Sequence, residues 1–544
     1  ALAQPKSWIQ DCKHKHTECN MIAIDSKWYP TRLIDVGPLE MSENAETPCR
    51  LVNTSDESIG GPYLTLSHCW GEAKSLILTK SNAAQFHKSI ASDDLPLLYS
   101  EAVKVAKELG IRYLWIDALC IIQEGDDFAD WRHESTLMDK VYSHAFCNIS
   151  AMSAKDSEDC LFSNRNSEAS QLPVIWRDVE GRASPAFLVD AHFWSSEVRG
   201  ALVNTRAWVL QELLLSRRIL FIGERQVLWH CRSTREAEVW PPNTPIDDVT
   251  ELGRIEDLPL GCGSARHKPN DRRNAYLCWH DIVSRYTRCK ISFPSDRLIA
   301  LSAVAKEMMP VLEDEYVAGM WRRHLESELI WWSFFPFEPS PSPSDQLYRA
   351  PSWSWASAET EVVPGRPYKD CKVDRFIEVE DFHLEHVTGD TTGLVSEGWL
   401  RLWGRLKQIK LSPSGDWRPE GHREAWKMVS RVKRQDGTLW SVRLDKFHDN
   451  FDEQNAKSTL YCMPAELESW EAGKSSFGAE AYEYLYVVLL ELQDERRGVF
   501  RRLGVASAYG AAGETKNSVL AREEGDGKFS CEEYRDGKHL IRII

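Results

Sequence analysis

The stretch that decides the fold of the N-terminal half reads Leu109-Gly-Ile-Arg-Tyr-Leu-Trp-Ile-Asp-Ala-Leu-Cys-Ile-Ile-Gln123. Its centre, Tyr113–Ile116, is a short continuous apolar run, which is typical of a strand covered on both faces. An amphipathic segment, Leu95–Leu109, precedes this run, with Pro96 in its first turn and Gly110 as its stop. This pattern predicts a helix. A helix that leads into a doubly covered strand indicates an α/β sheet.

The same alternation extends to both sides of this stretch. Strands are expected at Gly61–Leu66 and Phe146–Ser150, helices at Trp131–Ala145 and Arg206–Leu215, and a hairpin at Arg218–Ile222 and Gln226–His230. Strand–helix alternation predicts a mainly parallel, doubly wound sheet. We expect Tyr63–Leu66, Tyr113–Ile116 and Phe146–Ser150 to be adjacent central strands.

Changes in composition divide the chain of 544 residues into four parts. Residues 1–60 read as an irregular lead-in, and residues 61–240 as the α/β domain. Residues 241–350 read as a Pro-, Gly- and Asp-rich linker over 241–275 and a helical region, closed by the proline-rich run Pro336–Pro351. Residues 351–544 read as a mostly β domain, a barrel or a sandwich, with strands at Trp399–Leu406, Leu439–Leu444, Tyr482–Leu492, Val499–Ala506 and His539–Ile544.

Charge and apolar content limit the classes of partner. The net charge of −16 argues against non-specific binding of nucleic acid. No apolar run approaches the ~20 residues that span a bilayer, and the N-terminus carries no secretion pattern. The 14 cysteines are scattered and many lie in apolar settings, so we expect free thiols in a reducing compartment. These features predict a cytoplasmic protein without a membrane span.

Three N-terminal residues have side chains of the metal-ligand type. Cys12, His16 and Cys19 lie close together in the sequence, with His14 between them. A closed structural zinc site needs four ligands, and no fourth is visible nearby. A packed helix is therefore the preferred interpretation, and no metal site is predicted, although metal binding by these residues stays open.

Three long motifs occur in a fixed order and carry a family resemblance. They are Tyr63-Leu-Thr-Leu-Ser-His-Cys-Trp-Gly71, the stretch 109–123 quoted above, and Thr205-Arg-Ala-Trp-Val-Leu-Gln-Glu-Leu-Leu-Leu-Ser-Arg217. Together they resemble the fungal heterokaryon-incompatibility (HET) domain, strongly over 63–231. A weaker likeness extends over 276–357 and includes Ala350-Pro-Ser-Trp-Ser-Trp-Ala-Ser357. The chain departs from the family at His68, where Tyr is more usual, and at Cys160, where Gly is usual.

The HET family in turn resembles TIR domains, which have a flavodoxin-like fold. Leu66-Ser67 followed by Gly71-Glu72 is similar to the end of the first TIR strand, and Trp115-Ile116-Asp117 to the end of the second. Trp208-Val-Leu-Gln-Glu212 fits the TIR pattern W-x-x-x-E. In TIR enzymes this Glu is the catalytic residue for cleaving NAD, so the resemblance implies that role for Glu212.

The residue types are compatible with such chemistry. The open ends of parallel strands commonly bind ligands, and Glu212 and Trp208 share one helix face. One carboxylate could stabilise an oxocarbenium-like ribose, with NAD as substrate and no cofactor, and Arg206 or Arg132 could hold the diphosphate. The expected substrate-binding residues are Ser67, His68, Trp70, Gly71, Asp117, Arg206 and Trp208.

Each of these residues also has a purely structural interpretation. Glu212 could pair with Arg217 or Arg218, and Ser67 or Asp117 could cap a loop. His68 could be a buried, satisfied imidazole, and the tryptophans could be core residues. Glu134 is expected to be a solvated helix position.

The preferred prediction is a stand-alone HET effector with TIR-like NAD glycohydrolase activity in self/non-self recognition and cell death. Because TIR-like modules often self-associate, a homo-oligomer is expected to complete the site. One alternative is a signalling or assembly module without chemistry. The other is an enzyme of fungal small-molecule biosynthesis that uses the crevice for a substrate other than a nucleotide.

Overall fold

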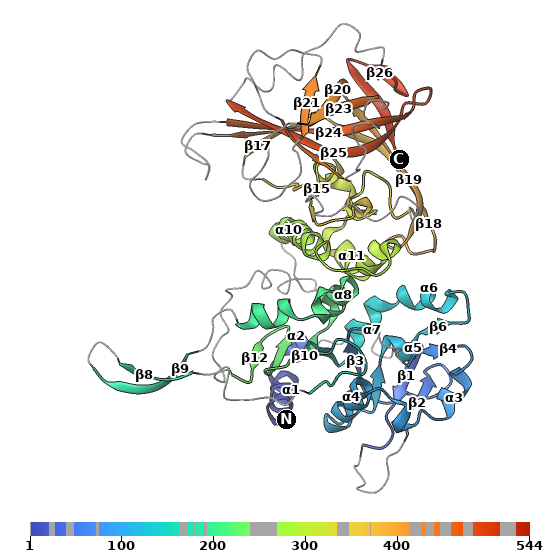
Figure 1. Ribbon diagram of the computed structural model, residues 1–544, viewed down its shortest axis with the longest axis vertical. Coiled ribbons are helices and arrows are strands. Elements are labelled where there is room, and N and C mark those ends of the chain that lie inside the picture. The colour runs from blue at the N-terminus through green and yellow to red at the C-terminus, as the bar shows by residue number, and fades with distance from the viewer. Residues whose placement is uncertain are drawn as a thin grey trace. The chain divides into compact units, whose positions relative to one another are not determined.

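The computed structural model describes most of the chain, and its residues form two compact units (Figure 1). The first unit is Ala1–His267 with Cys289–Ile291 and Ala300–Met308, and the second is Lys268–Arg288, Ser292–Ile299 and Met309–Ile544. The described residues are 2–20, 28–39, 48–71, 76–162, 172–177, 181–188, 193–239, 269–333, 348–369, 371–413, 426–430, 440–445, 459–471, 482–511 and 529–544. Most of the predicted linker 241–275 and of Pro336–Pro351 lies outside them.

An eight-stranded sheet forms the centre of the first unit. In spatial order its strands are β12 (Arg235–Ala237), β11 (Val227–Cys231), β10 (Arg218–Ile222), β7 (Cys147–Ala151), β3 (Tyr63–Ser67), β5 (Tyr113–Trp115), β1 (Arg32–Asp35) and β2 (Arg50–Asn53). The middle strands β10, β7, β3 and β5 are parallel. The predicted adjacency of the three motif strands is thus confirmed, with β3 between β5 and β7.

The sheet is less parallel than predicted, because both of its edges are antiparallel, although the hairpin predicted at Arg218–Ile222 and Gln226–His230 is confirmed as β10 and β11. β1 and β2 pair antiparallel on one side, and β11 and β12 do so on the other. Residues 1–60 are also more than an irregular lead-in, because they supply β1, β2 and two helices. The strand β1 is only four residues long, and its charged ends are buried by ion pairs. Arg32 lies 2.5 Å from Asp130, and Asp35 lies 2.7 Å from Arg112. Because the strand begins and ends with a charged residue, its sequence lacks the apolar run that would predict a buried strand.

The helices of the first unit connect the strands. They are α1 (Ala3–Lys15), α2 (Thr17–Asn20), α3 (Ala83–Lys88), α4 (Leu97–Glu108), α5 (Asp117–Cys120), α6 (Ala129–Ser135), α7 (Met138–His144) and α8 (Ala207–Leu215). The single helix predicted over Trp131–Ala145 is divided between α6 and α7. The two pieces bury different residues, since α6 buries Glu134 and Ser135 whereas α7 buries an apolar face.

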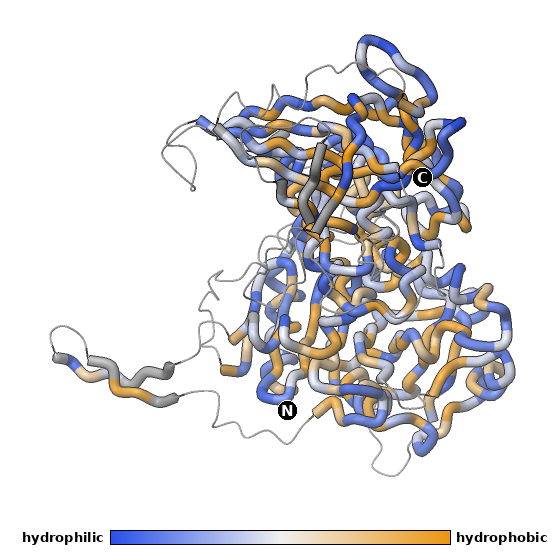
Figure 2. The backbone as a smooth tube through the Cα atoms, turned by 45° about the horizontal axis from the view of Figure 1, so that its top comes forward, coloured by the Kyte–Doolittle hydropathy of each residue, from blue (hydrophilic) through white to orange (hydrophobic). Residues whose placement is uncertain are grey.

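The core of the first unit follows the predicted apolar faces. Leu98, Ala102 and Val105 of α4 are buried, as are all residues of β3, β5, β7 and β10. Figure 2 shows orange, hydrophobic stretches of backbone within the part of the protein that carries the N-terminus, and these strands supply many of its buried hydrophobic residues. Two short pairs lie outside the large sheet: β4 (Leu78–Thr79) with β6 (Ile122–Glu124), and β8 (Leu172–Arg177) with β9 (Ala183–Leu188).

The second unit contains the long helix α10 (Pro269–Tyr286) and an eleven-stranded sheet among its described residues. The sheet is antiparallel except for the β25–β27 pair. Its strands are β17 (Lys372–Arg375), β18 (Glu378–His386), β19 (Val395–Gly404), β20 (Lys407–Pro413), β21 (Trp426–Ser430), β22 (Trp440–Leu444), β23 (Leu460–Trp470), β24 (Tyr482–Asp494), β25 (Val499–Ala511), β26 (Glu533–Arg535) and β27 (Lys538–Ile543). The five strands predicted there are confirmed as β19, β22, β24, β25 and β27.

Helix α11 (Ile299–Leu312) contributes residues to both units. Among the helices that the structure describes, none combines the length and the apolar character that a bilayer crossing requires.

Candidate functional site

The carboxyl end of β3 meets helix α8 through one side-chain hydrogen bond. Ser67 is the last residue of β3, and its hydroxyl donates to Oε2 of Glu212, in the second turn of α8. The two residues are 145 positions apart in the sequence, yet both are buried, at 1% and 5% exposure. The structure therefore joins the first and third sequence motifs at a single carboxylate.

A chain of polar side chains on β3 and β7 orients Ser67. Thr65 and Ser67 alternate onto one face of β3, and the strand register places Asn148 of β7 opposite Thr65. The Asn148 amide donates to the Ser67 hydroxyl at 2.9 Å, and Thr65 Oγ1 donates to Asn148 Oδ1 at 3.0 Å. The Ser67 hydroxyl thereby receives a hydrogen bond on one side and gives its own proton to Glu212.

The environment of Glu212 weakens its acidity. Burial raises the pKa of this carboxyl from its ordinary value of 4.5 to about 7. The charge of Asp117 acts in the same direction, whereas the Ser67 hydrogen bond, Arg206 and Tyr142 lower the pKa. The carboxyl consequently changes its charge near neutral pH, a property that is common among functional groups in enzymes.

A second group of side chains surrounds Asp117, the first residue of α5. The Trp70 indole donates to Asp117 Oδ2 at 2.9 Å, and His68 Nδ1 lies 3.8 Å from Asp117 Oδ1. His68 is buried, and its Nε2 contacts the Tyr99 hydroxyl at 3.0 Å. Burial lowers the pKa of this imidazole, so His68 is neutral at pH 7. The side chain of Asp117 remains 26% exposed, which makes it the solvent-facing acid of the site.

The loop after β3 is fixed by Gly71 and Arg206. Gly71 has φ +63°, and a Cβ at this position would lie 2.4 Å from Cβ of Asp156, so only glycine fits. Arg206 is the N-cap residue of α8, and its guanidinium donates to the carbonyl of His68. The β3 loop and the start of α8 are therefore held together from both sides.

Trp208 has a packing role as well as its place in the motif. It is partly buried on α8, and its ring meets Trp131 edge to face, with ring centroids 6.0 Å apart. This ring contact links helix α8 to helix α6. Trp115 is fully buried and packs on Tyr142, as a core residue does.

The structure differs from two of the expectations drawn from the sequence. Arg218, a suggested partner of Glu212, instead donates to Cys12, Phe146 and Asn20. Glu134 was expected to be solvated but is 2% exposed, because α6 turns it toward Arg32 at 3.5 Å. The expectation that Glu134 is solvated is therefore wrong. Helix periodicity alone does not show that the buried guanidinium of Arg32 lies opposite Glu134.

The sequence did not identify several residues that support the side chains of Ser67, His68 and Glu212. Asn148, Tyr142, Thr65 and Tyr99 were absent from the predicted site. Asn148 carried a usable signal, because a polar side chain within the apolar run Phe146–Ser150 needs a buried hydrogen-bond partner. Tyr142 and Tyr99 fit the apolar faces of their helices, so their hydroxyl contacts become visible only in three dimensions.

The position of the site in the sheet is one that α/β folds often use for ligands. The chain leaves β3 toward β5 and later returns to β7 on the other side of β3. The carboxyl ends of β3 and β7 therefore flank a topological switch point, where ligands of open α/β sheets commonly bind. Ser67 and His68 lie at this point, with Glu212 and Asp117 beside them.

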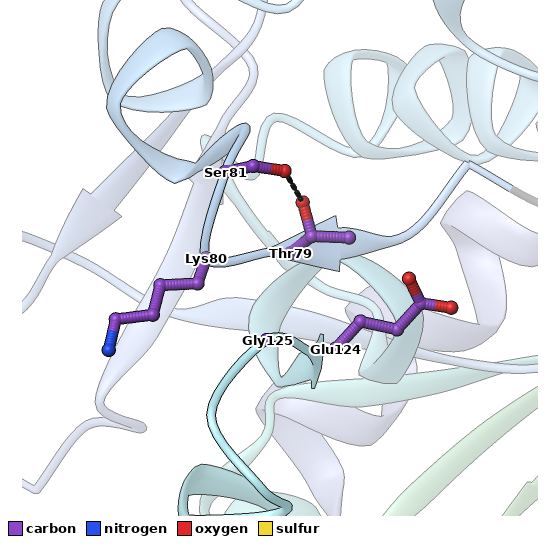
Figure 3. Close-up of a pocket in the computed structure, with 5 residues that line it drawn as sticks. All are labelled: Thr79, Lys80, Ser81, Glu124 and Gly125. Carbon is purple, nitrogen blue, oxygen red and sulfur yellow. Dashed lines mark hydrogen bonds between the residues drawn. The ribbon is translucent and has the colours of Figure 1, made fainter.

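A separate surface pocket lies between β4 and β6 (Figure 3). It is lined by Thr79, Lys80, Ser81, Glu124 and Gly125, and the hydroxyls of Thr79 and Ser81 lie 2.8 Å apart. The side chains of Lys80 and Glu124 point away from each other (Figure 3). None of the predicted site residues lines this pocket.

Residues 63–212 match the family model described as heterokaryon incompatibility protein (HET). The resemblance inferred from the motifs is confirmed over this segment, which begins at the first residue of β3 and ends at Glu212. No curated protein and no solved structure matches the chain.

Proposed function

We propose that residues 61–240 form a TIR-like module that cleaves NAD, with Glu212 as its catalytic carboxylate. The observation that carries the proposal is the buried Ser67–Glu212 hydrogen bond at the carboxyl end of β3. It unites the serine and the glutamate of the two TIR-like motifs, at the start and the end of the HET match. A family linked to incompatibility fits a self/non-self effector that depletes NAD and triggers cell death.

The order of the parallel strands supports a flavodoxin-like module. The parallel strands β3, β5, β7 and β10 are numbered one to four along the chain. Across the sheet they lie in the order two, one, three, four, that is β5, β3, β7, β10. Flavodoxin-like sheets begin with the same order and bind their ligands at the switch point between strands one and three. Those strands are β3 and β7 here, and Ser67 and Asn148 belong to them.

The proposed reaction needs a negative charge more than a proton donor. The bond between ribose C1′ and the nicotinamide nitrogen breaks, and its electron pair stays on that nitrogen, so nicotinamide leaves as a neutral molecule. A water oxygen bonds to C1′, and its proton passes to solvent. The ionised Glu212 carboxylate would stabilise the oxocarbenium-like ribose between these events. Arg206, at the start of α8, would hold the diphosphate of the nucleotide by hydrogen bonds.

The direct test is incubation of the purified full chain with NAD, with nicotinamide release followed over time. Glu212→Gln should abolish release, whereas Glu134→Gln should not. Glu134 is a matched control, because it is equally buried and its pKa is also raised by burial, but it faces Arg32 instead of Ser67. Cleavage by the Glu212→Gln variant at the parent rate would remove the carboxylate from the mechanism.

Self-association is the second part of the proposal. Glu212 and Ser67 are buried within one copy, so a nucleotide would reach them through the partly exposed Trp70 and Asp117. If a second copy of the chain completes the opening beside Trp70 and Asp117, specific activity should rise steeply with protein concentration. A specific activity that stays constant over a broad dilution series would contradict completion by a partner copy while leaving NAD cleavage intact.

The second candidate function is a non-catalytic assembly module. It is favoured by the same burial, because the hydrogen-bonded chain Thr65–Asn148–Ser67–Glu212 also satisfies polar groups in a closed core. If the parent chain releases no nicotinamide even when concentrated, NAD cleavage is contradicted. The assembly module and a biosynthetic enzyme with another small-molecule substrate would then be the preferred functions.

A further inference from the structure

The N-terminal cysteine and histidine cluster gains a fourth member in the fold. Cys12 lies in α1, His16 caps its C-terminal end, and Cys19 lies in α2. Cys231, the last residue of β11, joins them from 212 positions beyond Cys19. The Sγ atoms of the three cysteines and one ring nitrogen of His16 all lie within 4.8 Å of one another.

The distances suit a small four-coordinate ion. Zinc binds Cys sulfur at about 2.3 Å and His nitrogen at about 2.0–2.1 Å, so tetrahedral ligands stand roughly 3.3–3.8 Å apart. Sγ of Cys231 lies 3.4 Å from Nδ1 of His16. The spacing Cys-x3-His-x2-Cys along two consecutive short helices brings the other two sulfurs to the same point. Three sulfurs and one imidazole form a closed Cys₃His set with no place for substrate water.

The surroundings supply the hydrogen bonds that metal thiolates receive. Arg218, itself 3% exposed, donates from Nε to Sγ of Cys12 at 3.2 Å. The hydroxyl of Ser233 lies 3.6 Å from Sγ of Cys19, and that of Thr234 lies 3.5 Å from Sγ of Cys231. Outer contacts of this kind hold ligands in position and tune their charge.

Asn20 fixes the backbone that carries the ligands. Its amide nitrogen donates to the carbonyls of Cys12 at 3.1 Å, Lys13 at 2.9 Å and His16 at 2.8 Å. Its amide oxygen accepts from Arg218 at 2.5 Å. The same guanidinium thus supports both a ligand sulfur and the turn between the two helices, which preorganises the cluster.

We propose that Cys12, His16, Cys19 and Cys231 bind one structural zinc ion. Cys12, Cys19 and Cys231 are buried, so three free thiolates would be costly there. Three thiolates and Zn²⁺ carry a net charge of −1, and the buried guanidinium of Arg218 balances it. Hard cations such as Ca²⁺ and Mg²⁺ prefer oxygen ligands, which this set lacks.

The zinc ion would anchor the N-terminal segment to the edge of the sheet. Helix α1 packs against β11, which lies next to the edge strand β12, and Cys231 ends β11. β10 and β11 follow α8 directly, so the ion fixes the hairpin next to the helix that carries Glu212. Residues 3–20 and 231 lie outside segment 63–212, which matches the HET family model, so the proposed anchor is formed entirely by residues outside that match.

Metal content of the full chain is the primary test. The protein is purified without an affinity tag under reducing conditions, given one equivalent of Zn²⁺, desalted, and analysed by elemental mass spectrometry. We expect about one zinc per chain for the parent and for Cys120→Ser, the matched control of an equally buried cysteine in α5. Cys231→Ser should fall below about a tenth of that content.

Variants at His16 keep the test independent of whether Cys231→Ser folds. His16→Cys should retain about one zinc, because Cys₄ is also a closed zinc site. His16→Ala should lose zinc to a competing chelator at least about tenfold more readily than the parent. Co²⁺ added to the metal-free parent should give the intense absorption of a tetrahedral cobalt thiolate site.

Three results would overturn the assignment. The first is a parent chain that stays metal-free with Zn²⁺ present. The second is Cys231→Ser that retains as much zinc as the parent. The third is a metal-free protein, prepared without reductant, in which peptide mapping shows a disulfide between two of Cys12, Cys19 and Cys231.

Discussion

Replacing Glu212 by Gln tests the electrostatics of the site directly. The amide has nearly the volume of the carboxyl, and its oxygen can still accept the hydrogen bond from Ser67. The substitution therefore removes the ionisable charge and leaves the packing of α8 almost unchanged. Any effect that depends on pH can then be assigned to the charge of this one group.

The magnitude follows from the pKa of Glu212. Burial raises it from 4.5 to about 7, and at about 1.4 kcal/mol per pKa unit the difference corresponds to about 3 kcal/mol. Because the folded pKa lies above the unfolded one, the neutral form favours the fold. The parent is expected to lose this stability as pH rises from about 4.5 through 7. Glu212→Gln does not titrate, so it should gain up to about 3 kcal/mol relative to the parent between pH 4 and pH 8.

The Glu212→Gln substitution should lower the rate of NAD cleavage, although it raises the stability of the protein. If the ionised carboxylate stabilises a cationic transition state, its loss costs a few kcal/mol, which is roughly a hundredfold or more in rate. In the parent, a pKa of about 7 means that the ionised fraction, and with it NAD cleavage, rises roughly tenfold from pH 6 to pH 8. The variant is thus expected to be stable and inactive.

Two assays separate the possible explanations. Denaturant unfolding at pH 4 and pH 8 gives the free energy of unfolding of parent, Glu212→Gln and the control Glu134→Gln, and nicotinamide release is measured at pH 6, 7 and 8. A stability difference that does not change with pH would refute the argument from burial. A Glu212→Gln variant that melts early at all pH values would instead identify the carboxylate as a structural partner.

Three further predictions concern the neighbours of Glu212. Ser67→Ala removes a hydrogen bond that lowers the pKa of Glu212, so the midpoint of the pH–activity profile should move upward; an unchanged midpoint would contradict the contact. Trp208→Ala should cost about 2 kcal/mol through lost packing and lower the melting temperature by roughly 5 °C, checked by calorimetry, with the pH–rate midpoint retained. Gly71→Ala should destabilise the protein by about 2–4 kcal/mol in denaturant unfolding, since its Cβ would collide with Asp156 in a left-handed backbone conformation; a neutral effect would show that the loop can move.

Local apolar patterns were sufficient to place the central strands. β3, β5 and β7 are short and fully buried, so each is rich in apolar residues and can be found from the sequence alone, although Thr65 and Asn148 lie among those residues. Polar and edge elements gave no such signal. β1 begins and ends with a buried charged residue. The break between α6 and α7 depends on the different residues that the two helices bury.

For the candidate site, the sequence by itself determined which residues carry the motifs, including Ser67 and Glu212, and that they lie near strand and helix ends. Only the tertiary structure decided that these two side chains touch, that Asn148 orients them, and that Cys231 joins the N-terminal cysteines. The physical reason is that periodicity and propensity act over a few residues. Hydrogen bonds between residues 145 positions apart, and a four-ligand cluster drawn from α1, α2 and β11, depend instead on how the sheet brings distant segments of the chain together.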